Sequence, residues 1–165
     1  APQHRHTRIV ITLDDGRDLR FLDQRTFGGL TLAPLVDGIP GPVTHIAPDP
    51  FEECFDVDEV VRRLCARRSA IKRSLLDQTL VSGIGNIYAD ETLWRVRCHP
   101  ETPCSRLSQS EAVELLQTAC DVMAEAMSQG GTSFDSLYVN VNGESGWFSR
   151  VLDAYGREDE PLPPM

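Results

Sequence analysis

The stretch at residues 75–94, LLDQTLVSGIGNIYADETLW, limits the fold more than any other part of the chain. Two apolar runs with helical periodicity flank the motif GIGN at residues 83–86. Glycine tolerates a left-handed backbone and allows close approach to a ligand, so we predict a tight turn followed by a helix that begins at Asn86. The start of a helix presents unpaired N–H groups and the positive end of the dipole. The turn is therefore a candidate anion site.

Two polar side chains near this turn could complete a phosphate site. Lys72 lies one predicted helix earlier and could supply a positive charge, while Asn86 could supply a neutral donor that fixes geometry. Simpler interpretations remain open at this point. Lys72 could be a solvated surface lysine, and Asn86 could be an ordinary helix cap.

The remaining sequence predicts strands first and helices later. Residues 7–13 and 17–22 are β-branched or alternating runs joined by DDG, a pattern typical of a hairpin. Asp56 is expected to cap a helix that runs to about residue 67, and further helices are expected at about 70–80 and 86–96. A longer helix begins at a capping box of Ser108 and Glu111 and ends near residue 130. We therefore predict an α+β fold with a β segment in residues 1–35, a Pro- and Gly-rich surface linker in 36–56, and a mainly helical domain in 57–165.

For binding to nucleic acid, the distribution of charge along the chain matters more than the net charge. The formal net charge of -9 argues against a nucleic-acid partner if it is spread evenly. However, residues 62–73 contain six Lys or Arg and no acid, whereas residues 52–59 contain five acids. The local field decides what binds to a face, so the basic stretch is a candidate DNA contact. A solvated helix face beside an acidic loop is the alternative.

Composition also bears on cellular context. The five cysteines are scattered and include no C-x-x-C pair, which favours reduced thiols over disulfides or a zinc site. No apolar run approaches a membrane span, and the first residues lack the apolar core of a signal peptide. We therefore expect a cytoplasmic protein with no membrane partner.

Longer motifs resemble one enzyme family. The segment IKRSLLDQTLVSGIGNIYADETLWRVRCHP at residues 71–100 resembles the helix-two-turn-helix element of formamidopyrimidine-DNA glycosylases, bacterial base-excision repair enzymes that remove oxidised bases. HTRIVITLDDGRDLRFLDQRTFGG looks like the last strands of the family's N-terminal β-sandwich, GGTSFDSLYVNVNGESGWF like its lesion-facing loop, and AYGRE like the approach to its zinc finger. The resemblance implies a helix-two-turn-helix domain preceded by a β-hairpin remnant of the sandwich.

The resemblance also implies roles for individual residues. Lys72 and Asn86 would hold the phosphates that flank a damaged nucleotide in double-stranded DNA. Arg25 and Phe27 would fill the gap left in the duplex, the guanidinium meeting the orphaned base and the ring wedging the stack. Without the resemblance, a β-turn with a core phenylalanine is the alternative for this pair. The full predicted set of DNA-binding residues is His6, Arg25, Phe27, Arg67, Arg68, Lys72, Gly85, Asn86, Tyr155 and Arg157.

Two departures from the family pattern affect catalysis and cofactors. The family's nucleophile is an N-terminal proline followed by a glutamate, and that segment is not matched here. Pro2 is acylated by Ala1 and is followed by Gln3, so it has no free amine and no neighbouring acid, and we predict no catalytic residue. Leu162 stands where the first zinc-finger cysteine is expected, so we predict neither zinc nor another cofactor.

Three functions from different classes are compatible with these observations. The first is a non-catalytic DNA-binding protein that binds damaged or bent duplex through phosphates. The second is a DNA glycosylase and AP lyase of base-excision repair whose catalytic segment is missing from this chain. The third is a protein-interaction module that keeps the fold without binding DNA. We also predict a homo-oligomer, because strands without sandwich partners expose edges and apolar surface.

Overall fold

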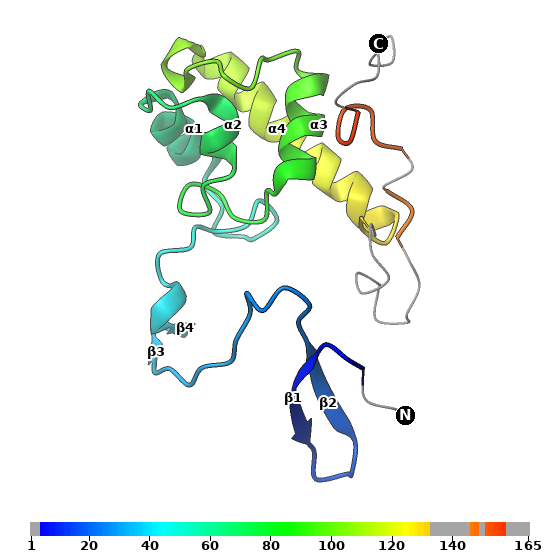
Figure 1. Ribbon diagram of the computed structural model, residues 1–165. Coiled ribbons are helices and arrows are strands. Elements are labelled where there is room, and N and C mark those ends of the chain that lie inside the picture. Colours follow the sequence, from blue (N-terminus) through cyan, green and yellow to red (C-terminus); the bar gives the residue numbers. More distant parts are fainter. Residues whose placement is uncertain (1–3, 133–145, 149–150, 158–165) are drawn as a thin grey trace. The chain divides into compact units, whose positions relative to one another are not determined.

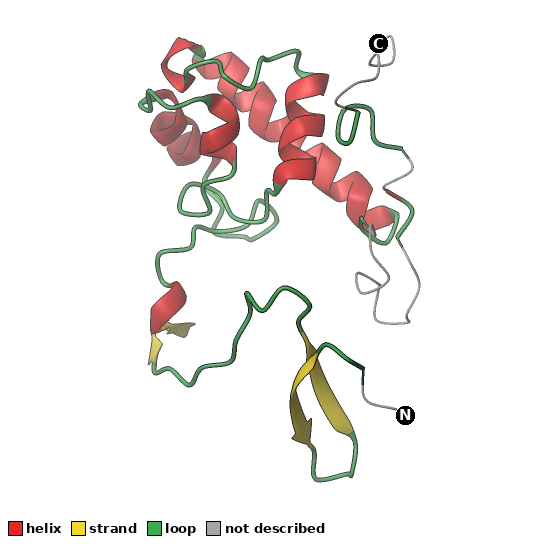
Figure 2. Cartoon of the chain, viewed as in Figure 1, coloured by secondary structure: helices red, strands yellow, loops and turns green. Residues whose placement is uncertain are grey.

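The chain divides into two compact units, Ala1–Pro42 and Val43–Met165, and each is considered by itself. The computed structural model describes residues 4–132, 146–148 and 151–157 (Figure 1). Strands occur in the first unit, and the helices α1 to α4 belong to the second (Figure 2). The predicted α+β fold is confirmed.

The first unit contains the predicted hairpin. Strand β1, Thr7–Thr12, pairs antiparallel with β2, Asp18–Leu22, and the register shifts near the start of β1. Gly16 adopts a φ of +79° in the connecting turn, a conformation that suits glycine. The Asp15 carboxylate accepts a hydrogen bond from the backbone N–H of Arg17 at 3.0 Å. Local turn chemistry therefore closes the hairpin.

Short elements occur inside the segment predicted to be a linker. Strand β3, Leu35–Val36, pairs antiparallel with β4, Ile39–Pro40, and a single 3-10 turn, η1, follows at Gly41–Val43. The two residues between the strands, Asp37 and Gly38, both have positive φ, of 51° and 83°. Two adjacent left-handed residues are typical of a tight two-residue hairpin, which explains the pairing.

The second unit contains the helices. Helix α1 spans Val57–Cys65, α2 spans Ile71–Leu75, α3 spans Asn86–Arg95 and α4 spans Gln109–Ser128, with a 3-10 turn, η2, at Cys104–Arg106. Both predicted N-caps are confirmed. The Asp56 side chain accepts from the N–H of Glu59, and Ser108 and Glu111 form a reciprocal capping box.

Helix α2 is shorter than the helix predicted over residues 70–80. It ends at Leu75, and the Asp77 carboxylate then accepts from the backbone N–H of Thr79 at 3.0 Å and from its hydroxyl at 2.7 Å. Aspartate bonded to a backbone N–H two residues ahead competes with helix propagation. Apolar periodicity alone therefore overestimated the length of this helix.

One apolar core fixes the arrangement of these helices. Leu64 of α1, Leu75 of α2, Leu93 of α3 and Leu115 of α4 are all buried in the same cluster, together with Ile84 from the turn. A second cluster packs Phe148 and Leu152 against α4 and against residues of α3. In Figure 1 the orange-to-red segment accordingly runs beside α3. The core thus holds α2, the turn and α3 in a defined arrangement.

Candidate nucleic-acid interface

The two glycines of the turn meet different structural requirements. Gly83 has a φ of +86°, and a Cβ there would lie 2.7 Å from Oδ2 of Asp49 and 3.0 Å from Cε of Met123. Gly85 has a φ of -101°, and a Cβ there would meet nothing within 4 Å. The left-handed conformation is therefore needed only at Gly83, while Gly85 leaves open space at the surface.

A glutamine that sequence reasoning did not single out holds the turn closed. Nε2 of Gln78 donates to the carbonyl oxygens of Leu76 at 3.2 Å and Ile84 at 3.0 Å, and its Oε1 accepts from the N–H of Gly83 at 2.9 Å. The Gln78 carbonyl also accepts from the N–H of Ala47 at 2.9 Å. One side chain thus satisfies three polar groups of the turn, a role that an isolated glutamine does not signal in sequence.

Helix α3 begins at the turn with open amides. Gly85 is the N-cap and supplies no capping side chain, and Ala89 is the first residue to donate back, to the Gly85 carbonyl at 2.9 Å. Within the described part of the chain, the N–H groups of Asn86, Ile87 and Tyr88 have no acceptor. Asn86 is the exposed first residue of the helix and not its N-cap. Its side chain is therefore not used as a helix cap. This is the arrangement that binds anions at helix starts.

Lys72 belongs to α2 and contacts α3 near this helix start. Its Nζ forms an ion pair of 2.6 Å with Oδ1 of Asp90, and the two side chains are 31% and 26% exposed. Asp90 follows Asn86 by four residues, so their side chains lie on one face of the helix. Lys72 is therefore a positioned lysine and not a freely solvated one.

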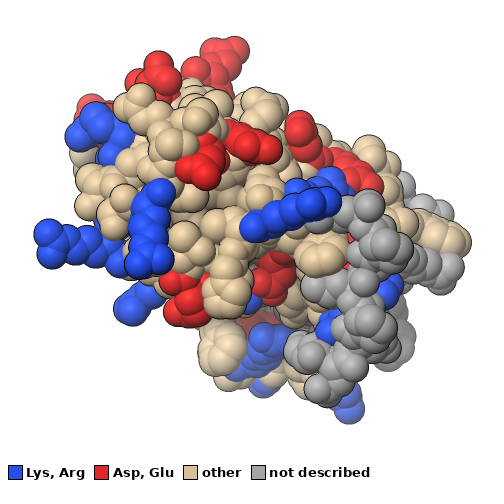
Figure 3. Space-filling view, turned by 90° about the horizontal axis from the view of Figure 1, so that it is seen from above, with Lys and Arg blue, Asp and Glu red and all other residues tan. Residues whose placement is uncertain are grey.

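The other predicted basic contacts are partly neutralised. Nη1 of Arg67 lies 2.6 Å from Oδ2 of Asp77. Hydrogen bonds from the Thr79 hydroxyl and then from Arg67 lower the pKa of Asp77 to about 2, so its carboxylate is charged at neutral pH. Arg68 is exposed. Two of the basic residues in the stretch 62–73, Arg67 and Lys72, are thus paired with carboxylates. Figure 3 likewise shows acidic and basic side chains on the same face of the molecule.

A buried glutamate anchors the segment that carries the last two predicted contacts. Glu91 of α3 is fully buried, and its carboxylate accepts from the backbone N–H groups of Asp153 at 3.0 Å, Ala154 at 2.8 Å and Tyr155 at 2.9 Å. Tyr155 is half-buried against the second apolar cluster, and Arg157 is half-buried two residues later. No local sequence pattern indicates this long-range contact.

The first unit presents the predicted gap-filling pair on a well-defined turn. The Asp23 carboxylate accepts from the backbone N–H groups of Arg25 at 3.1 Å, Thr26 at 2.8 Å and Gly28 at 2.7 Å. These bonds, that of Gly28 most of all, lower the pKa of Asp23. Arg25 is exposed and Phe27 is 86% exposed, so Phe27 is not a core residue of this unit.

His6 lies in the same unit. Its Nε2 accepts from Nε of Arg5 at 2.9 Å, and its ring lies beside that of His4, with centroids 5.4 Å apart. His6, Arg25 and Phe27 all belong to the first unit and form one group of predicted contacts. The residues around the start of α3 form a second group.

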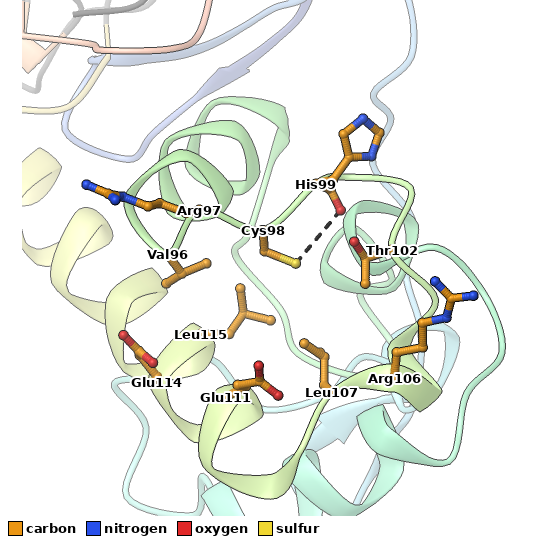
Figure 4. A pocket seen from close by; sticks show the side chains of 10 residues that line it. All are labelled: Val96, Arg97, Cys98, His99, Thr102, Arg106, Leu107, Glu111, Glu114 and Leu115. Carbon is orange, nitrogen blue, oxygen red and sulfur yellow. Dashed lines mark hydrogen bonds between the residues drawn. The ribbon is translucent and has the colours of Figure 1, made fainter. Parts of the chain in front are cut away.

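A separate cavity of about 380 Å³ lies between the residues after α3 and the start of α4 (Figure 4). Its walls include Arg97, Cys98, Arg106 and Glu114, and none of the predicted DNA contacts lines it. The Cys98 thiol points into this cavity, and all five cysteines are unpaired.

Neither a metal-binding cluster nor a membrane-spanning helix occurs in the part of the chain that the structure describes. No three His, Cys, Asp or Glu side chains gather there to hold a metal, and no helix there is long and apolar enough to cross a membrane. The prediction about zinc concerns Leu162, which lies outside the described residues.

Comparisons with known proteins show the family of the chain. Residues 46–137 match the family model described as "Formamidopyrimidine-DNA glycosylase H2TH domain". The chain belongs to the formamidopyrimidine-DNA glycosylase family. It is 60% identical to a protein of that name from Mycolicibacterium vanbaalenii over 98% of this chain and 56% of the relative, and 57% identical to one from Rhodococcus jostii. The chain thus spans little more than half the length of these glycosylases.

Solved structures of glycosylases are similar as well. The MutM (Fpg) protein of Thermus thermophilus matches with a TM-score of 0.82 at 34% identity, over 98% of this chain and 61% of that chain. The Lactococcus lactis Fpg, solved in complex with DNA containing an abasic site, matches with a TM-score of 0.81 at 31% identity, over 98% and 59%. The likeness covers the helix-two-turn-helix unit and the hairpin of this glycosylase family member.

Proposed function

We propose that this chain binds double-stranded DNA through its phosphates, with the start of α3 as the principal contact, and that it favours bent or damaged duplex. The observation that carries the proposal is the convergence of three donors near the start of α3. The open amides and the exposed Asn86 side chain lie at the start of α3, and the Lys72 ammonium is paired with Asp90 one helical turn further along. Together they offer directed hydrogen bonds and a charge to a phosphate.

The space at Gly85 and the turn of the first unit support the same function. A Cβ at Gly85 would meet no protein atom within 4 Å, so a phosphate could approach the backbone there. The exposed ring of Phe27 and the exposed side chain of Arg25, two residues earlier, suit the filling of a gap in a stacked duplex. A lesion or a bend lowers the energy needed to open that gap, so we expect the chain to prefer bent or damaged duplex over intact duplex.

Two substitutions test the phosphate site. Lys72→Ala should weaken duplex binding uniformly across sequences and reduce the dependence on salt, because one cationic contact is lost. Asn86→Ala should weaken binding without changing the salt dependence, because the amide carries no charge. Fluorescence anisotropy at several salt concentrations measures both effects. With a net charge of -9, we expect dissociation constants of about 1–100 µM, the range of non-specific complexes.

A matched control separates local from general charge effects. Arg106 is exposed and lines the cavity of Figure 4 rather than the α3 start, so Arg106→Ala removes the same charge elsewhere. It should bind nearly as the parent does. If Lys72→Ala and Asn86→Ala also bind like the parent, the turn is only a structural connection, and the protein-interaction alternative is favoured.

The names of the relatives favour a second candidate function, a DNA glycosylase and AP lyase of base-excision repair. Pro2 is bonded through its nitrogen to Ala1 and is followed by Gln3, so Pro2 offers no free amine as a nucleophile, and we expect no Schiff base to form there. We expect DNA binding through the start of α3 to need neither zinc nor another cofactor. Incubation with duplex carrying an oxidised guanine, followed by borohydride, should trap no covalent adduct. A trapped adduct that disappears with Pro2→Gly would establish the enzymatic function instead.

A further inference from the structure

Two of the basic residues predicted to contact phosphates form short ion pairs with carboxylates of the same unit. Lys72 has Asp90 at 2.6 Å, and Arg67 has Asp77 at 2.6 Å. Asp77 also bonds to Thr79 and so contributes to the fold of the turn region. Asp90 differs, because within the described residues its side chain forms no polar contact other than the ion pair with Lys72. Its carboxylate stands on the helix face that is expected to meet DNA.

We propose that Asp90 is an internal counterion that lowers the affinity of this face for DNA. The proposal rests on the proposed function. In the free protein the carboxylate occupies a donor direction of the Lys72 ammonium that a phosphate would use. On binding, the phosphate competes for that donor and also meets the negative charge of Asp90. Asp90 therefore opposes binding twice, by occupying the cation and by repelling the phosphate.

The size of the effect follows from the distances along the helix. Asn86 and Asp90 are one turn apart, so a phosphate at the helix start lies about 7 Å from the carboxylate. A unit charge at about 7 Å, at the dielectric constant of water, changes affinity about threefold, and a lower effective dielectric constant increases the change. Counterion release adds a second signature. A phosphate that meets a free lysine releases more bound cation from DNA than one that meets a lysine paired with a carboxylate.

Asp90→Asn tests the proposal because it keeps the shape of the side chain and removes the charge. At low salt it should bind a plain duplex about threefold or more tightly than the parent, and its salt slope should steepen by up to about one unit. In the Lys72→Ala background, Asp90→Asn should leave the salt slope unchanged, because there is no Lys72 ammonium for the substitution to free from its ion pair. Circular dichroism establishes that each variant is folded, and Asp90→Ala serves as a second charge-free variant.

Glu114→Gln is the control for net charge. Glu114 is exposed on α4, lines the cavity of Figure 4 and has no ion pair within the described part of the chain, so its loss changes net charge away from the α3 start. It should alter affinity less than twofold. Equal gains from Glu114→Gln and Asp90→Asn would overturn the proposal in favour of a general charge effect.

The outcomes also separate this proposal from the proposed function. If Lys72→Ala weakens binding while Asp90→Asn leaves it equal or weaker, DNA binding stands, and Asp90 positions Lys72 instead of opposing the phosphate. If Lys72→Ala and Asn86→Ala both bind like the parent, the proposed function fails, and the role of Asp90 fails with it. Tighter binding with a steeper slope for Asp90→Asn alone supports both.

Discussion

Replacement of Gly83 by alanine should destabilise the helical unit while leaving its surface chemistry unchanged. A non-glycine residue in the left-handed conformation costs about 1–2 kcal/mol. The new Cβ would also lie 2.7 Å from Oδ2 of Asp49 and 3.0 Å from Cε of Met123. Both atoms end flexible side chains, but the Asp49 carboxylate accepts from the N–H of Phe51 at 2.9 Å, so its displacement adds about 1 kcal/mol. We expect a loss of about 2–3 kcal/mol in the free energy of unfolding.

Urea unfolding followed by circular dichroism measures this loss. With a slope of about 2 kcal/mol/M, the midpoint should fall by about 1–1.5 M. Gly85→Ala is the matched control, because its φ of -101° is ordinary and its Cβ meets nothing. It should unfold within about 1 kcal/mol of the parent, yet bind DNA more weakly, since the methyl group occupies the space that a phosphate needs. An unchanged midpoint for Gly83→Ala would refute the reasoning from φ and space.

Three further predictions concern stability, anchoring and assembly. The pKa of Asp77 is about 2 in the folded protein and ordinarily 3.8, so its contribution to stability, about 1 kcal/mol after solvent screening, is complete above pH 4 and is lost as pH falls towards 2. The drop in urea midpoint between pH 6 and pH 3 should therefore shrink in Asp77→Asn. Glu91→Ala should accelerate hydrogen exchange of the amides at residues 153–155, measured by mass spectrometry, while those of α4 exchange as before. Analytical ultracentrifugation should detect self-association through the exposed apolar residues of the hairpins, and a clean monomer at high concentration without binding of a hydrophobic dye would contradict this.

Local sequence signals predicted most of the secondary structure. The hairpin, the cap at Asp56, the capping box at Ser108 and the start of α3 at Asn86 all follow from residues within a few positions of one another. The predicted end of α2 was wrong. The apolar pattern continues for one more turn, but the hydrogen bonds from Thr79 to the Asp77 carboxylate end the helix earlier. Patterns of period 3.6 report which residues can be buried, not where a side chain terminates the helix.

The long-range polar contacts of the site could not be predicted in this way. Glu91 accepts hydrogen bonds from amides more than 60 positions away. In the sequence it looks like any other glutamate in a helix. Gln78 likewise acts by reaching back over the turn. Such contacts depend on the tertiary arrangement that the apolar core creates, so a single sequence carries no periodic signal for them.

The charge balance of the site explains how an acidic chain can still suit DNA. Lys72 and Arg67 are each paired with a carboxylate, so their net contribution to a phosphate is smaller than their number suggests. The open amides at the start of α3 have no such carboxylate within the described residues, because the N-cap is Gly85, which has no side chain to bond them. Binding that depends on amides and Asn86 releases few counterions. We therefore expect a salt slope of only about one or two units for the parent chain, and a slope of about four or more would show that free cations dominate.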